Sequence, residues 1–94
     1  MLSTEHLELV RRIIREAVPE ARAYVFGSRA TGRARPFSDL DILFVQPARL
    51  GWAQRADLLE RFEASELPFR VDVVDDEGLA PGMRDRVEAE RLPL

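Results

Sequence analysis

Cysteine and lysine are both absent from the chain of 94 residues, and histidine occurs once, as His6. The lack of cysteine excludes disulfides, thiolate nucleophiles and zinc–sulfur sites. The lack of lysine excludes Schiff-base chemistry and the type of phosphate-binding loop that depends on a lysine. A single histidine argues against a multi-histidine metal site and against a Ser–His–Asp triad. Many familiar classes of enzyme are therefore excluded before any motif is considered.

The chain also lacks an apolar run near the roughly 18 residues that a membrane span requires, and no charged-then-apolar leader opens it. We therefore expect a soluble, cytoplasmic protein with no membrane partner. Its 14 basic and 17 acidic residues give a formal net charge of −3, which argues against a nucleic acid as partner. The length supports one domain, residues 1–94, with a thin core, so a second copy or a partner protein is expected to cover some apolar surface.

Hydrophobic spacing predicts an alternation of helices and strands. Three helices are predicted, from Ser3 or Thr4 to Pro19, from Gly51 to Pro68 and from Met83 to Glu90. Three strands are predicted over residues 23–26, 40–45 and 69–74, with a functional loop or a broken helical turn over residues 27–38. The pattern indicates an α+β or α/β fold with helices packed against a small mixed sheet. The second and third strands can be parallel, and the first two antiparallel.

Several side chains in these elements receive structural interpretations. Trp52 and Tyr24 are expected to pack in the core, and His6 is expected on the surface of the first helix. Asp75 and Asp76 follow the third predicted strand and are interpreted as turn residues.

Three aspartates form the candidate catalytic and metal-binding group. Asp39 and Asp41 lie two residues apart at the start of the second strand, so their carboxylates share one face and repel unless a cation lies between them. Oxygen ligands of this kind suit Mg²⁺ or Mn²⁺. Asp72 lies in the third strand, and a neighbouring strand would bring it beside the first two, as in sites with two metal ions. The alternatives are a solvated acidic strand face and, for Asp72, an edge-strand charge that discourages aggregation.

A second group of candidates lies between the first two strands. Gly27 lets the backbone approach a phosphate closely and Ser28 adds a hydroxyl, although such a pair is also a common turn. Arg29, Arg33 and Arg35 follow and offer guanidinium groups to nucleotide phosphates. Arg29 is favoured because it directly follows Ser28, and the alternative for each arginine is a solvated position in the loop.

These residues also carry a resemblance to a known family. Phe26-Gly27-Ser28 is followed after ten residues by Asp39-Leu40-Asp41-Ile42. This arrangement resembles the signature of the polymerase-β-type nucleotidyltransferase superfamily. Residues 27–42 are especially similar to the minimal nucleotidyltransferases (MNT proteins), which are often encoded beside a helical HEPN protein as a toxin–antitoxin pair.

The resemblance implies a polymerase-β-like fold with assigned roles for the candidate residues. Gly27 and Ser28 would bind the triphosphate, and Asp39 and Asp41 would hold magnesium. Asp72 would be the third acid, which completes a second metal site or takes the proton from the attacking hydroxyl.

The resemblance further implies a magnesium-dependent enzyme that moves AMP from ATP onto a hydroxyl of a partner protein. That partner would be a HEPN toxin, which the chain would silence as its antitoxin. The short chain supports a protein acceptor, because little of it is left to form a pocket for another acceptor. One alternative is a non-catalytic antitoxin that covers the surface of its partner. Another is nucleotidyl transfer to a small molecule or to an RNA end.

Overall fold

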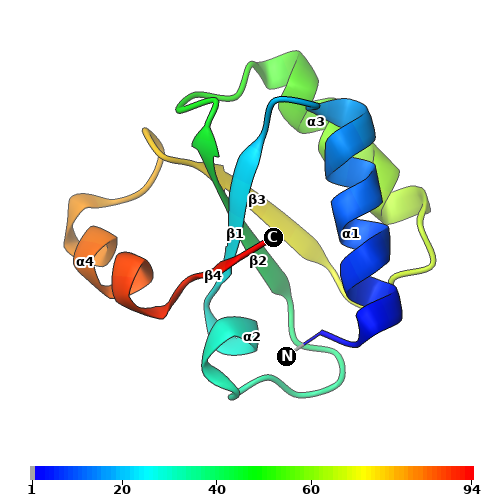
Figure 1. The fold of residues 1–94 in the computed structure, drawn as a ribbon, viewed down its shortest axis with the longest axis horizontal. Coiled ribbons are helices and arrows are strands. Elements are labelled where there is room, and N and C mark those ends of the chain that lie inside the picture. The colour runs from blue at the N-terminus through cyan, green and yellow to red at the C-terminus, as the bar shows by residue number, and fades with distance from the viewer. Residues whose placement is uncertain (1) are drawn as a thin grey trace.

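The structure is a computed structural model that describes residues 2–94. In this part of the chain the elements follow in the order α1 (Thr4–Ala17), β1 (Arg22–Phe26), α2 (Ser28–Thr31), β2 (Leu40–Gln46), α3 (Trp52–Ala64), β3 (Val71–Asp75), α4 (Pro81–Glu90) and β4 (Leu92–Pro93) (Figure 1). The predicted small mixed sheet with packed helices is confirmed. The single turn of α2 occupies part of the segment for which a loop or a broken helical turn was predicted.

The strands form one sheet in the order β3-β2-β1-β4. As predicted, β1 and β2 are antiparallel and β2 and β3 are parallel. A parallel pair needs a crossover connection, and α3 lies in the one between β2 and β3. The pattern did not predict β4, because its two residues are too few to show an alternation. This strand pairs only with Tyr24 and Val25 of β1.

Local signals in the sequence explain where α1 begins and ends. The Ser3 side chain accepts a hydrogen bond of 3.1 Å from the backbone N–H of His6, which is the N-cap expected for a serine at this position. Val10, Ile13 and Ile14 lie one turn apart on the buried stripe of the helix. The helix ends at Ala17, just before Pro19, whose ring cannot continue it.

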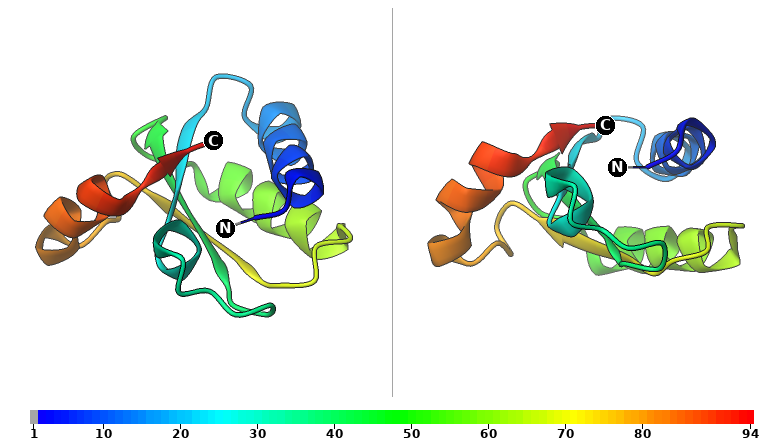
Figure 2. Two further views of the ribbon diagram at one scale, coloured as in Figure 1. Left: turned by 60° about the horizontal axis from the view of Figure 1, so that its bottom comes forward. Right: turned by 90° about the horizontal axis from the view of Figure 1, so that it is seen from below.

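The alternation of side chains gives the sheet two unlike faces. The face that packs against α1 and α3, here called the helical face, carries most of the core, including Val25, Ile42 and Phe44. The opposite face, here called the open face, carries Phe26 and Leu43 in a smaller cluster that α4 helps to cover. Figure 2 shows α4 across the sheet from α1 and α3. Because α4 covers only part of the open face, the remainder of this face is available for polar groups.

Two aromatic side chains depart from the predicted core. Trp52 is 85 % exposed, because α3 is anchored by Leu58 and Phe62 and Trp52 lies about 240° around the helix from Leu58. Tyr24 is only half-buried, and the Arg91 guanidinium lies 4.1 Å from the centre of its ring. Neither aromatic ring therefore forms part of the central core.

None of the helices in residues 2–94 has the length and apolar character needed to cross a membrane.

Candidate active site

The inner strand β2 and the neighbouring edge strand β3 bring Asp41 and Asp72 together. Asp41 of β2 is the register partner of Asp72 of β3. Register partners in parallel strands point to the same face, and the partner of Asp41 on β1 is Phe26 of the open face. Both carboxylates therefore lie on the open face, near its apolar cluster. Asp39 lies just before β2 and is exposed to solvent.

The electrostatics of Asp41 reflect this gathering of acids. Partial burial raises the pKa of the Asp41 carboxyl, and the charges of Asp72 and Asp39 raise it further. The folded chain thus holds a carboxylate in surroundings that disfavour its charge. A bound cation would remove that penalty, because it screens all three like charges at once.

The donor set fits a hard divalent cation in chemistry and in charge, since it consists of carboxylate oxygens. Within residues 2–94, however, no three acidic or imidazole side chains stand close enough to form a complete ligand cluster. Asp72 also makes an ion pair of 3.4 Å with Arg70, whose guanidinium is largely exposed. Asp72 would have to leave this exposed and therefore weak pair to join Asp41 at a cation.

Gly27 lies directly against Asp41. It directly follows β1 with a φ of +74°, which favours glycine, and a Cβ atom at this position would collide with the Asp41 carboxylate. Ser28 then begins the short helix α2. The turn predicted to bind phosphate is therefore adjacent to the acids predicted to bind metal, although residues 29–38 separate them in the sequence.

The structure places Arg29 differently from the prediction. Its side chain is buried, and its guanidinium donates hydrogen bonds to the backbone carbonyls of Arg35, Pro36 and Ser38. A guanidinium that is committed to these carbonyls and shielded from solvent is poorly placed to receive phosphate groups. Arg33 and Arg35 are exposed in the same loop and retain the predicted possibility of a phosphate contact.

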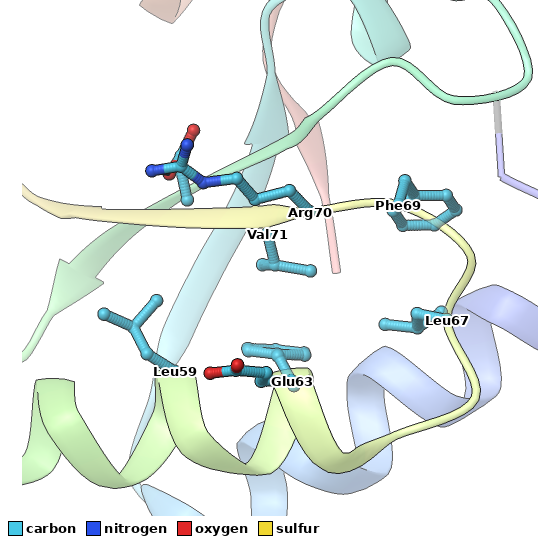
Figure 3. A pocket seen from close by; sticks show the side chains of 8 residues that line it. Leu59, Glu63, Leu67, Phe69, Arg70 and Val71 are labelled. Carbon is cyan, nitrogen blue, oxygen red and sulfur yellow. Dashed lines mark ion pairs between the residues drawn. The ribbon is translucent and has the colours of Figure 1, made fainter.

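A cavity of about 480 Å³ lies beside β3, between this strand and α3 (Figure 3). In Figure 3, Val71 points from β3 towards Leu59 and Glu63 of α3, whereas Arg70 points away from α3. The cavity reaches around the edge of the sheet and is lined by Leu59, Phe62, Glu63, Leu67, Phe69, Arg70, Val71 and Asp72. Its floor is mostly apolar, and its rim includes one of the candidate acids.

Asp75 was predicted to be a turn residue, but it is the last residue of β3 and is buried on the helical face. Its carboxylate accepts hydrogen bonds from the backbone N–H groups of Leu50, at 2.8 Å, and Gly78, at 2.7 Å. It also pairs with Arg55 at 3.3 Å. The spacing from Asp75 to Gly78 is typical of a turn held by an aspartate side chain, and this spacing could have identified the role.

The family of the chain follows from its sequence as a whole. The model of the family described as the nucleotidyltransferase domain matches residues 7–93. The chain belongs to this nucleotidyltransferase family, which confirms the resemblance seen in residues 27–42.

One curated protein and two solved structures illustrate which members of this family the chain is similar to. The chain is 38 % identical over 74 residues to "Probable protein adenylyltransferase MntA" of Haemophilus influenzae, an alignment that covers 79 % of this chain and 65 % of that protein. A solved structure assigned as a minimal nucleotidyltransferase is 33 % identical, with a TM-score of 0.75 over 99 % of this chain and 97 % of the other. A toxin–antitoxin structure with AMP-PNP is 25 % identical, with a TM-score of 0.75 over 92 % of this chain and 69 % of the other. The chain thus spans about two thirds of the length of its curated relative.

Proposed function

We propose that this chain transfers AMP from ATP onto a hydroxyl group of a partner protein and acts as the antitoxin of a HEPN-type toxin–antitoxin pair. The observation that carries the proposal is the register of Asp41 with Asp72 on the open face, with Gly27 directly against Asp41. The relative named as a protein adenylyltransferase and the toxin–antitoxin structure with AMP-PNP support the nucleotide and the kind of partner.

In this mechanism Asp39, Asp41 and Asp72 hold Mg²⁺, or Mn²⁺, which neutralises charge on the phosphates when it is bound. Gly27 lets the backbone come close to the triphosphate, and Ser28 offers its hydroxyl to it. The acceptor oxygen attacks the α-phosphorus, the bond to pyrophosphate breaks, and the acceptor loses its proton. Asp72 either completes the metal site or takes this proton, and its place on the edge strand β3 leaves its carboxylate accessible to an acceptor from a partner protein.

The test is to mix the chain with the helical protein encoded beside it, ATP and Mg²⁺, and to follow the intact mass of the partner. We expect one adenylate to be added, and Asp72→Asn to slow the addition about 10²- to 10⁴-fold, the usual contribution of a general base. Asp85→Asn, an exposed aspartate of α4, is the matched control and should leave the rate unchanged. If the wild-type chain leaves the partner unmodified, protein adenylylation is the wrong reaction.

A non-catalytic antitoxin is the second candidate, and the ion pair between Arg70 and Asp72 favours it, because the chain itself already supplies one of the acids with a positive charge. In that case Asp41→Asn would neutralise the partner as well as the wild-type chain does. Labelled ATP offered to RNA ends and to small hydroxyl compounds tests the remaining alternative, in which the acceptor is not a protein.

A further inference from the structure

Arg29 is unusual because it is a buried arginine in so small a protein, with 6 % of its surface exposed. Its guanidinium donates hydrogen bonds to backbone carbonyls of the loop that leads into β2. Nε donates to the Ser38 carbonyl at 3.0 Å, and Nη2 donates to the same carbonyl at 2.8 Å and to that of Pro36 at 3.2 Å. The residue after Ser38 is Asp39, the first of the three candidate acids.

The face of the same guanidinium lies over an aromatic ring. The Arg29 Cζ atom is 4.0 Å from the centre of the Phe69 ring, within the range of a cation–π contact. Phe69 lies three residues before Asp72, on the segment that enters β3, and its ring also meets His6 of α1 edge-on at 5.5 Å. Nothing about the loop sequence alone requires this contact, because it joins residues 40 positions apart.

Arg29 therefore links the three segments on which the candidate site is built. It follows Ser28 of the glycine turn, binds the carbonyls beside Asp39 and stacks on the segment that leads to Asp72. The Leu40 N–H bonds the Arg70 carbonyl at 2.8 Å, so the two acid-bearing segments are already joined at this level of the sheet. Arg29 holds the stretch before that bond through the carbonyls of Pro36 and Ser38, although residues 35–37 are exposed to solvent.

We propose that Arg29 is a positioning residue that sets the place of Asp39 relative to Asp41 and Asp72, and that it does not touch the nucleotide. The proposal rests on the proposed function for its consequence in catalysis, although its structural part stands independently. It requires the planar guanidinium and not merely a positive charge. A lysine ammonium can neither bridge two carbonyls in one plane nor stack flat on a ring.

The kinetic test compares Arg29→Lys, which keeps the charge, with Arg29→Ala supplemented by guanidinium chloride far below its denaturing range. We expect Arg29→Ala and Arg29→Lys each to lower kcat on the order of 100-fold, as for a displaced catalytic group, and to change the KM for ATP less than twofold. Added guanidinium should recover part of the kcat of Arg29→Ala. A rise in the KM for ATP that Arg29→Lys repairs would overturn the proposal, because a phosphate contact needs mainly charge.

The second test needs no transfer activity and so separates this proposal from the proposed function. Hydrogen exchange of the amides in residues 34–39 should quicken at least about tenfold in Arg29→Ala, and the amides of β1 and β2 should keep their protection. Unchanged exchange in residues 34–39 would overturn the proposal, even if the wild-type chain transfers AMP. Conversely, quickened exchange supports it even if the wild-type chain transfers nothing.

A matched control and a second variant guard against a general loss of folding. Arg49→Ala removes an exposed arginine beyond the opposite end of β2 and should change neither kcat nor the exchange of residues 34–39. Phe69→Leu keeps Arg29 and removes the aromatic ring beneath its guanidinium, together with the edge-on contact of that ring with His6. It should give a smaller effect in the same direction on both readouts, and its failure to quicken exchange would also count against the proposal.

Discussion

Asp72 and Asp75 lie three residues apart on β3 and therefore on opposite faces of the sheet, and their surroundings differ completely. On the helical face, Asp75 is buried, and its two oxygens accept backbone N–H groups from Leu50 and Gly78 while Arg55 supplies the opposite charge. On the open face, Asp72 is in register with Asp41, another acid, and its ion-pair partner is the exposed Arg70.

This difference shows how the role of an aspartate can be inferred from its neighbours. The charge of Asp75 is matched by donors of the chain itself, so the fold gains from it. Asp41 and Asp72 carry like charges that repel each other, so the fold alone gains nothing from bringing them together. Such an arrangement is understandable when a ligand that binds there supplies the missing positive charge.

The largest effect on stability is expected on the helical face. Asp75→Ala leaves the Leu50 N–H without its partner and Arg55 without its opposite charge, so the free energy of unfolding should fall by about 2–4 kcal/mol. Urea denaturation measures it. Asp76→Ala is the matched control: it removes a half-exposed pair with Arg84 at 2.9 Å and should cost at most about 1 kcal/mol. Equal losses in the two variants would contradict the contrast between the faces.

An opposite and smaller effect is expected on the open face. Asp41→Asn removes a carboxylate whose charge is disfavoured, and should stabilise the chain without bound metal by about 1 kcal/mol, or roughly 4–8 °C in Tm, while it impairs transfer. Thermal unfolding measures the shift, with Asp85→Asn as a control for the loss of one exposed negative charge.

The gain from Asp41→Asn should depend on pH in a defined direction. The pKa of Asp41 is higher in the folded than in the unfolded chain, so its ionisation reduces stability as pH rises through the ordinary value of 3.8 and then through the raised one. The difference in Tm between the variant and the wild type should be absent below this range and complete above it. At neutral pH, Mg²⁺ should raise the Tm of the wild type more than that of the variant. A difference that shrinks with rising pH would contradict this assignment.

The smallest effect is expected where a side chain contributes to neither face. Trp52→Ser replaces a residue that is 85 % exposed at the start of α3, so it should change the free energy of unfolding by no more than about 0.5 kcal/mol. Chemical denaturation followed by circular dichroism measures it, since the variant lacks the tryptophan signal. A loss near that of Asp75→Ala would mean that Trp52 belongs to the core after all.

The sequence predicts the elements that depend on local patterns, such as α1 with its serine cap and the apolar alternation of β1 and β2. It also predicts that Asp39, Asp41 and Asp72 can meet, because strand parity and a helical crossover decide which face each acid occupies. It does not predict the partners of Arg29, because they are backbone carbonyls in an irregular loop and the ring of Phe69, which is 40 positions away in the sequence. The prediction that Trp52 packs in the core is wrong, because its position on the helix relative to Leu58 turns it to solvent in spite of its hydrophobicity.

Arg55 has a consequence for how the molecule behaves among copies of itself. Its guanidinium binds the Val73 carbonyl on β3, an outermost strand of the sheet, as well as the Asp75 carboxylate. A strand from another molecule that tried to extend the sheet there would have to displace this side chain and break its ion pair. The other outermost strand, β4, is two residues long and contains Pro93, which has no N–H to offer. Both borders of the sheet are thus protected against growth into fibrous aggregates.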